Sequence, residues 1–412
     1  MSKKKFLSAA FLDQGLVSLS NFSTSVILTR NLGLELFGAF TISWIIILLA
    51  QNIQLSFILT PILNIGPRLE GQEEEDFFNN SFTIQILFSL FSILIIILLF
   101  ILSDGFLGVQ EKSLNLLICF CMTLLTTQIH EFGRRYFYAK RKRKKILDID
   151  LARYISQIAG LVTLSFLGIR NISLVYLVIS ISSLLSILLN IKRLPKIVRF
   201  SKTIKKTFKE NWVLAKWLIP SSIIYWISQN LFLLFANKFM GLSSVGLIKV
   251  IQNLFSFTNI GFQAIDNWGY VEASRIFNQS GIRELNIFTK KLILYIGMTT
   301  FLIVLLIFLS HQSLMLNIFN VNAKGYGLAI LVYSFSPIIS SLNAPFRYYV
   351  ASIGKTNLNF ASQAVGLFVV AIITYPLIKN FGLVGSVGGI TIMQLSLLLT
   401  YIYNIKYRAI RK

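Results

Sequence analysis

Residues 30–38 read RNLGLELFG, and residues 238–246 read KFMGLSSVG. A basic residue, a leucine and two glycines recur in them at the same spacing, 208 residues apart. A second motif repeats in the same order, as RYFYA at residues 135–139 and RYYVA at residues 347–351. Motifs that recur in the same order predict a chain built from two similar halves with the same orientation.

Both halves have the composition of a membrane protein. Of the 412 residues, 55% are hydrophobic and only 13% are charged. Apolar runs of about 20 residues, long enough to span a bilayer as a helix, recur along the chain. They lie at residues 8–30, 36–62, 80–102, 113–134, 146–168, 172–191, 212–237, 244–267, 285–309, 325–346, 356–379 and 383–405. We therefore expect an all-α polytopic membrane protein with twelve transmembrane helices in two parallel-repeat, six-helix bundles.

The distribution of charge predicts the domains and the topology. The two bundles are expected at residues 1–191 and 212–412, joined by a basic cytoplasmic linker at residues 192–211. The net charge of +23 comes mostly from Lys and Arg in the two tails and the even-numbered turns, which places both termini in the cytoplasm. These basic residues then face an anionic leaflet, as topological anchors or as a lipid-headgroup patch, and no nucleic-acid partner is expected.

The sequence lacks the residue patterns of an enzyme. It has two His, and it contains no Ser/His/Asp set, no phosphate-binding loop and no HExxH motif. Cys119 and Cys121 lie within one predicted span, without a His or acidic cluster that could complete a metal site. We therefore expect a carrier with no catalytic residues, no metal and no cofactor.

Polar side chains follow one face of the first, seventh and eighth predicted spans at helical spacing. Such stripes either line a water-filled cavity or bond neighbouring helices to one another. The stripe on the eighth span runs from Lys249 to Asp266 without a break, which favours a cavity. The candidate cavity residues are Lys249, Arg153, Asn21, Gln14, Gln229, Tyr225, Gln252, Ser256, Asn259 and Gln263.

A second group of charged residues is suited to gating or coupling. Arg30 and Lys238 occupy matching positions in the first repeated motif, and Arg135 and Arg347 do so in the second. The full set of gate or coupling candidates is Asp13, Asp266, Arg30, Lys238, Arg135 and Arg347. His130 and Glu131, at the cytoplasmic end of the fourth span, are expected to be solvated or to cap their helix.

Several short motifs carry a family resemblance. They are DQG at 13–15, SNF at 20–22, LTRNLG at 28–33, FGAF at 37–40, GP at 66–67 and GRRYF at 133–137. In these the chain resembles the polysaccharide-biosynthesis flippases, the Wzx-type, O-antigen-like members of the multidrug/oligosaccharidyl-lipid/polysaccharide (MOP, MATE-like) exporter superfamily. The resemblance implies a central cavity in which basic residues face a diphosphate-sugar headgroup. The resemblance would assign that role to Lys249 and Arg153, and contact with the sugar to Asn21 and Gln229.

The resemblance implies a flippase of the cell (cytoplasmic) membrane. It would move a lipid-linked oligosaccharide to the outer face by alternating access, for surface or exopolysaccharide assembly. Its expected partners are that substrate, membrane lipids, and a polysaccharide polymerase and glycosyltransferases. Two alternatives stay open, a cation-coupled exporter of small amphipathic compounds and a non-transporting scaffold for glycosyltransferases. The first span has no Pro and no acid at mid-membrane, unlike the drug exporters of the superfamily, which weakens the first alternative.

Overall fold

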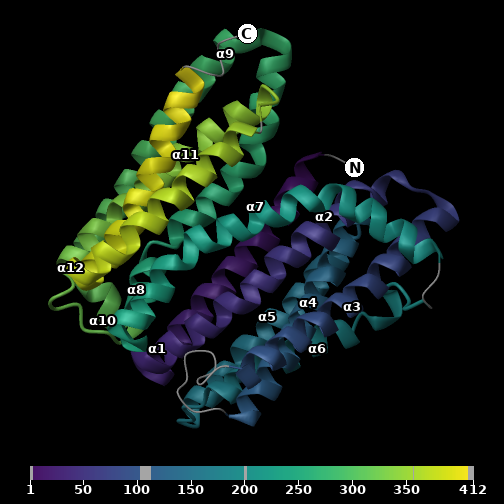
Figure 1. The fold of residues 1–412 in the computed structure, drawn as a ribbon, viewed down its shortest axis with the longest axis horizontal. Coiled ribbons are helices and arrows are strands. Elements are labelled where there is room, and N and C mark those ends of the chain that lie inside the picture. Colours follow the sequence, from purple (N-terminus) through teal and green to yellow (C-terminus); the bar gives the residue numbers. More distant parts are fainter. Residues whose placement is uncertain (1–2, 103–112, 199–201, 356, 407–412) are drawn as a thin grey trace. The chain divides into compact units, whose positions relative to one another are not determined.

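The computed structural model describes the backbone of residues 3–102, 113–198, 202–355 and 357–406, and their side chains except those of residues 3–14, 143, 202, 257 and 259–267. Every regular element in these residues is a helix, which confirms the all-α fold (Figure 1). The chain divides into two compact units, Met1–Ile223 (unit 1) and Ile224–Lys412 (unit 2). This boundary falls within one long helix, and the predicted division at a linker over residues 192–211 stays a prediction.

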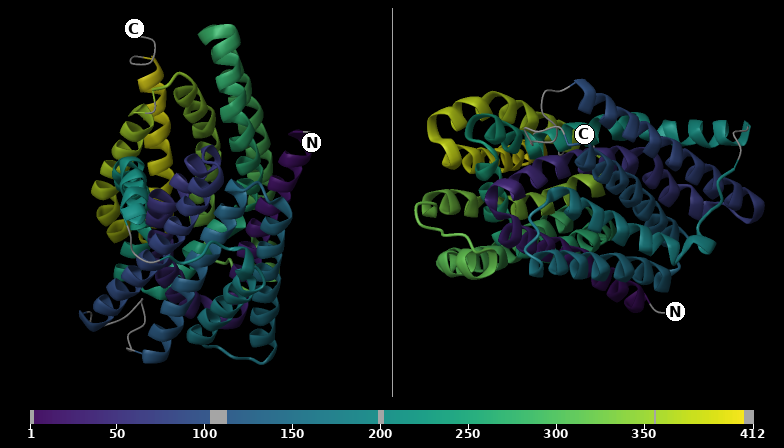
Figure 2. Two further views of the ribbon diagram at one scale, coloured as in Figure 1. Left: turned by 90° about the vertical axis from the view of Figure 1, so that its right-hand side faces the viewer. Right: turned by 90° about the horizontal axis from the view of Figure 1, so that it is seen from below.

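Unit 1 is a bundle of long helices joined by short turns. Its elements are α1 (Lys3–Gln54), α2 (Thr60–Asn64), α3 (Gly71–Leu102), α4 (Leu114–Ala139), α5 (Arg143–Phe166), α6 (Ile172–Leu188) and the first part of α7 (Lys202–Met240). Within the bundle, α4 packs against α3 and α6, and α5 packs against α6 and α1. Two further views show α3 to α6 side by side (Figure 2). The packing of α4, α5 and α6 encloses the site described below.

Unit 2 repeats this plan with a different division into elements. It contains the end of α7, α8 (Leu242–Leu254), α9 (Phe257–Leu309), the short α10 (His311–Phe319), α11 (Gly327–Ser352) and α12 (Asn357–Asn404). Its centre is α11, which packs against both α9 and α12. α4 and α11 have the same length of 26 residues and hold the same place in their halves.

Three of the longest helices are broken by a glycine with positive φ. These are Gly33 in α1, Gly281 in α9 and Gly382 in α12. Figure 1 shows the consequence for α1, whose purple ribbon runs from the N-terminus to one end of the bundle and returns to α2. With each of these helices divided at its glycine, and α8 grouped with the first part of α9, the described chain has twelve long segments in the predicted order.

The repeated sequence motif corresponds to a repeated backbone conformation. Gly33 has φ 77° and ψ 175°, and Gly241, its partner 208 residues later, has φ 80° and ψ 175°. Only glycine adopts this region without strain, because a Cβ would collide with the adjoining backbone. The matching glycines therefore end the first helix of each half in the same way.

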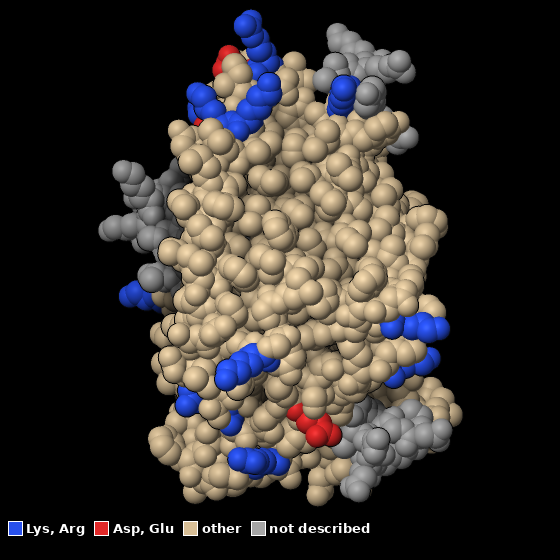
Figure 3. All heavy atoms as spheres, turned by 90° about the vertical axis from the view of Figure 1, so that its left-hand side faces the viewer, with Lys and Arg blue, Asp and Glu red and all other residues tan. Residues whose placement is uncertain are grey.

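The long helices present apolar side chains outward, as a lipid environment requires. Seven described helices are long and apolar enough to cross a membrane, and two shorter ones, Ile172–Leu188 and Leu242–Leu254, are also apolar. Figure 3 shows one face on which Lys and Arg gather toward the two ends and the middle carries apolar or uncharged side chains. α5 is not among the nine, because Asp150, Arg153 and Gln157 lower its hydropathy.

The glycine turns provide a first test. Neither Gly33 nor Gly241 has a neighbouring atom within 4 Å of an added Cβ, so an alanine there is strained by its backbone alone. Gly33→Ala and Gly241→Ala are each expected to cost about 1–3 kcal/mol, seen as a lower apparent melting temperature in detergent. Gly15→Ala is the control, because that helical site is equally open and has ordinary φ. Equal melting temperatures for all three variants would contradict the strained turn.

Candidate functional site

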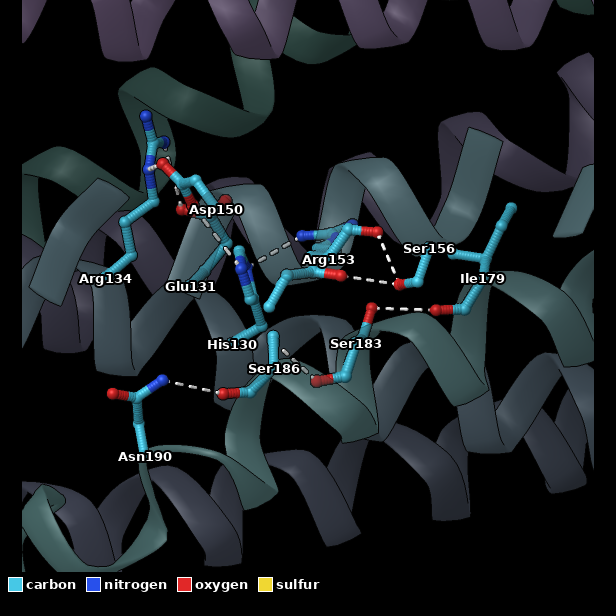
Figure 4. A network of polar contacts seen from close by, with 11 residues as sticks. His130, Glu131, Arg134, Asp150, Arg153, Ser156, Ile179, Ser183, Ser186 and Asn190 are labelled. Carbon is cyan, nitrogen blue, oxygen red and sulfur yellow. Dashed lines mark hydrogen bonds and ion pairs between the residues drawn. The ribbon is translucent and has the colours of Figure 1, made fainter. Parts of the chain in front are cut away.

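Five titratable side chains meet inside unit 1, between α4 and α5 (Figure 4). This α4–α5 charge cluster consists of His130, Glu131 and Arg134 on α4, and Asp150 and Arg153 on α5. His130 and Arg134 are about one helical turn apart, as are Asp150 and Arg153, so each helix presents two members on its facing side. Ionisable side chains inside membrane helix bundles are rare and mark functional sites.

Asp150 lies at the centre of the cluster. Its Oδ2 accepts a hydrogen bond from Arg134 Nε at 2.8 Å, and its Oδ1 lies 3.5 Å from His130 Nε2. Arg134 Nη1 also lies 3.9 Å from a carboxylate oxygen of Glu131. Asp150 and His130 have no exposed surface, and Arg134 is 6% exposed. The carboxylate of Asp150 is therefore compensated by groups of the protein instead of by water.

Arg153 is held by His130. Its Nη1 lies 2.8 Å from His130 Nδ1, and its guanidinium lies over the ring of Tyr154, 5.2 Å from the centroid. A guanidinium has donors and no acceptor, so Nδ1 of His130 must be the acceptor. The imidazole is therefore neutral and carries its hydrogen on Nε2, on the side of Asp150.

One donor of Arg153 remains available. The side chain is 5% exposed, and among the described atoms its Nε has no hydrogen-bond partner. Arginine binds carboxylate and phosphate groups through paired N–H donors, and such charge-assisted bonds are about twice as strong as neutral ones. The Nε–H of Arg153 is therefore a buried donor of the kind that binds such groups, next to the Nη1 that His130 holds.

The two halves match most closely at the turns that follow α4 and α11. Lys142 N donates to Phe137 O at 2.9 Å, and Lys355 N donates to Val350 O at 3.1 Å. Donors and acceptors are 213 residues apart, one more than the RYFYA and RYYVA motifs predict. In the structure, equivalent positions in this part of the two halves are therefore 213 residues apart, and not 212.

This register changes the expected pairing of arginines. Arg347 corresponds to Arg134, a member of the charge cluster, and not to Arg135 as the motifs predict. The counterparts of His130, Asp150 and Arg153 in unit 2 are Asn343, Gln363 and Gly366. Unit 2 thus keeps one arginine and replaces the titratable His and Asp with amides.

A neighbouring set of polar side chains is connected in a different way. Gln54 Nε2 donates to Gln85 Oε1 at 2.9 Å, and Ser89 Oγ donates to Gln128 Oε1 at 2.6 Å. Gln85 Nε2 also donates to Ser89 Oγ at 3.0 Å, and all four residues are fully buried. These neutral groups bond α1, α3 and α4 to one another, which is the packing role of polar side chains in membrane bundles.

The stripe of polar side chains predicted on the eighth span is divided between two helices. α8 ends at Leu254 and α9 begins at Phe257, so the continuous helix expected over residues 244–267 is interrupted. Ser256 Oγ donates to Asn253 O at 2.7 Å, and this local bond competes with the helical pattern at the break. Lys249 and Gln252 lie together above it, with Lys249 Nζ 3.4 Å from Gln252 Oε1.

The other predicted residues are distributed over several helices. Asn21 and Tyr225 are exposed, and Gln229 is half-buried. Arg30 and Lys238 are exposed beside the two equivalent glycine turns, whereas Arg135 and Arg347 are half-buried near the ends of α4 and α11. The side chains of Asp13, Gln14, Asn259, Gln263 and Asp266 lie outside the described residues. Cavity and gate roles for this set stay predictions.

Sequence reasoning missed most of the charge cluster. The expectation that His130 is solvated or caps its helix is wrong, because the side chain is completely buried. Nothing in the sequence alone singles out Asp150, and only Arg153 is a candidate there. The available signal is helical spacing, because His130 and Arg134 are four residues apart on one span and Asp150 and Arg153 are three apart on the next.

The fold is that of the MOP-superfamily transporters. The structure matches the lipid II flippase MurJ in its inward closed conformation with a TM-score of 0.75 and 14% identity, covering 97% of this chain and 87% of that one. It matches an inward-facing multidrug resistance MATE transporter with a TM-score of 0.68 and 14% identity, covering 95% and 94%. A MOP transporter from Pyrococcus furiosus gives 0.61 at 12% identity, covering 97% and 94%.

Comparison of the sequence with known proteins identifies the family within this superfamily. Residues 6–265 match the family model described as polysaccharide biosynthesis protein, so the chain belongs to that family. It is also 24% identical over 285 residues to the capsular polysaccharide biosynthesis protein CapF of Staphylococcus aureus, over 65% of this chain and 69% of that protein. The resemblance seen in the short motifs is confirmed, and the protein is a multi-pass membrane protein of polysaccharide biosynthesis.

The central place of Asp150 leads to a second test. Asp150→Asn removes the charge that compensates Arg134 and is expected to cost about 3–5 kcal/mol, the usual effect of breaking a buried ion pair. Asp148→Asn is the matched control on the same helix, because Asp148 is half exposed and pairs with the surface residue Lys145 at 2.7 Å. That exposed pair is worth about 0–1 kcal/mol. Similar melting temperatures for the two variants would show that Asp150 does not hold the cluster.

Proposed function

We propose that this protein is a flippase that moves an isoprenoid-diphosphate-linked oligosaccharide from the cytoplasmic to the outer face of the cell membrane. It supplies the assembly of a surface polysaccharide and works by alternating access. The proposal makes it a carrier and not an enzyme, with both termini in the cytoplasm. The polymerase and glycosyltransferases of the same pathway are its expected partners.

The observation that carries this proposal is the buried guanidinium of Arg153. A lipid-linked sugar can leave its chain in the bilayer, but its diphosphate must cross a region where a bare charge is costly. A pre-positioned arginine with a donor to spare lowers that cost by charge-assisted hydrogen bonding. Membership of the polysaccharide biosynthesis family supports this class of cargo, and the transporter fold supports movement across the membrane.

Lys249 supports the proposal from unit 2. It is half-buried on α8, and its ammonium has the Gln252 amide oxygen as a neutral neighbour. An amide does not neutralise a neighbouring ammonium as a carboxylate would. We assign Lys249 and Arg153, each within its own unit, to contact the headgroup.

Reconstitution tests this function. Purified protein in proteoliposomes is given a fluorescent polyprenyl-diphosphate monosaccharide, and flipping is followed by quenching of the label on the outer leaflet. The wild-type protein is expected to expose the probe faster than protein-free vesicles. A scaffold would leave the rate at the protein-free level, and an exporter of small amphipathic compounds would move an uncharged dye but not the probe.

The two cations provide a residue-level prediction. A hydrogen bond to a charged group contributes about 1.5–3 kcal/mol, so Lys249→Ala and Arg153→Gln should each slow flipping about tenfold to hundredfold. Lys379→Ala and Arg170→Ala are matched controls, because both residues are exposed and stand outside the proposed contacts. Unchanged flipping by Lys249→Ala, with normal insertion, would remove Lys249 from the headgroup contacts.

A further inference from the structure

The first part of α7, residues 203–219, packs on unit 1 through one narrow stripe of side chains. Its buried residues recur every three or four positions, at Ile204, Thr207, Asn211 and Ala215. Residues at this spacing share one face of a helix. The other side chains of this segment are exposed, apart from Glu210 and Ile219, which are half-buried. Most of the surface of this helix is therefore left for something other than the protein itself.

Contacts with α3 fix the rotation of this helix. Asn80 Nδ2 of α3 donates to Thr207 Oγ1 at 3.2 Å, within the buried stripe. Shortly before α7 begins, the backbone N–H of Lys196 donates to Asn79 Oδ1 at 2.7 Å. α3 therefore holds the chain both before and within α7, so the side chains opposite these contacts have a defined outward direction.

A second stripe on the same helix carries positive charge. Its exposed residues follow one another at spacings of four, three and four, as Lys205, Lys209, Trp212 and Lys216. At about 100° per residue, this stripe lies about 120° round the helix from the buried one, and it extends over about 17 Å. These four residues are called the α7 lysine stripe below.

The aromatic side chains of this segment are typical of a helix at a membrane surface. Trp212 is 49% exposed, and its ring lies 6.4 Å from that of Phe57, edge to face. Trp217 is 74% exposed. Both lie at the start of the span predicted over residues 212–237. Tryptophan is enriched at the level of the lipid headgroups, where a lysine can bury its stem and extend its ammonium toward the phosphates.

We propose that the α7 lysine stripe is a binding site for anionic phospholipids of the leaflet at that end of unit 1. Its ammonium groups contact the phosphate groups of neighbouring lipids, and Trp212 lies between them at the membrane interface. An anionic leaflet attracts each lysine near its surface, and this attraction adds along the stripe. The inference goes beyond the proposed function and does not depend on which cargo is carried.

The surroundings of the stripe favour a lipid over an acidic soluble protein. Val213 and Leu218 are exposed beside Trp217, so apolar and basic side chains alternate over the same helix. A bilayer surface offers hydrocarbon to the first kind and phosphate to the second, within one layer. Glu210 is the single acid in residues 192–219, so this part of the chain has almost no negative charge that would repel an anionic headgroup.

Trp212 allows the site to be tested by fluorescence, without transport. The chain has five Trp, and Trp212 becomes the single reporter when the others are replaced by Phe, at Trp44, Trp217, Trp226 and Trp268. In phosphatidylcholine nanodiscs, part of the lipid is exchanged for brominated phosphatidylglycerol or for brominated phosphatidylcholine. Bromine quenches only a nearby indole, so we expect stronger quenching by the phosphatidylglycerol. Equal quenching by the two lipids overturns the inference.

Substitutions on the same helix separate a defined site from general attraction to positive charge. Lys209→Gln and Lys216→Gln flank the reporter, and each should lower the preference for phosphatidylglycerol by up to about fivefold. Lys206→Gln is the matched control, because Lys206 is exposed about 90° round the helix from the stripe and lies 4.0 Å from Glu210. It removes the same charge and should change the preference little. Equal losses for Lys206→Gln and Lys209→Gln would overturn the site.

A second measurement keeps all five Trp and decides the question if the single-Trp protein does not fold. Native mass spectrometry counts the lipids that the protein retains from an equal mixture of phosphatidylglycerol and phosphatidylcholine. Wild type and Lys206→Gln should retain more phosphatidylglycerol than the double variant Lys209→Gln, Lys216→Gln. Equal retention by all three overturns the inference.

The phosphate that the stripe binds could also belong to an isoprenoid carrier lipid. Unlabelled polyprenyl diphosphate, added at one molecule per protein, tests this source in the fluorescence experiment. We expect quenching by the brominated phosphatidylglycerol to persist, because the bulk lipid is in large excess. Loss of that quenching would show a site for the carrier lipid and overturn the assignment to phospholipids of the leaflet.

Discussion

A carboxylate inside a membrane-spanning helix bundle needs a cation beside it, because neither hydrocarbon nor an apolar protein core solvates its charge. Asp150 meets this requirement through Arg134, across the contact between α4 and α5. The remaining geometry follows from that ion pair. His130 turns Nε2 toward the second carboxylate oxygen, which leaves Nδ1 for Arg153. Arg153 is the residue best placed to bind an anion. Its position thus depends, through His130, on Asp150, which does not itself bind the anion.

The two halves share a backbone plan and differ in chemistry. Their first helices end at glycines of the same conformation, and the turns after α4 and α11 form the same hydrogen bonds. Where unit 1 has a titratable histidine and aspartate, however, unit 2 has two amides. The repeat accounts for the shared backbone plan, and different side chains at a few buried positions place the charge cluster in unit 1 of the described chain.

The sequence predicted the order of the helices well and their continuity less well. Long apolar runs determine which segments span the membrane, since a helix needs about 20 apolar residues to cross the hydrocarbon core. The break between α8 and α9 was not predicted, because Asn253 and Ser256 suit a polar helical stripe and a local backbone bond equally well. The stripe that best supported a cavity is therefore divided in the structure.

The sequence by itself determined the membrane class, the duplication and the family, because these depend on composition and on motifs that are local in the chain. Only the tertiary structure decided which polar groups act together. His130 and Asp150 are twenty positions apart, and nothing local shows that they face each other until α4 and α5 pack. Once these side chains are buried, water no longer solvates their charges. Each charge is then balanced by the neighbouring side chains of the charge cluster.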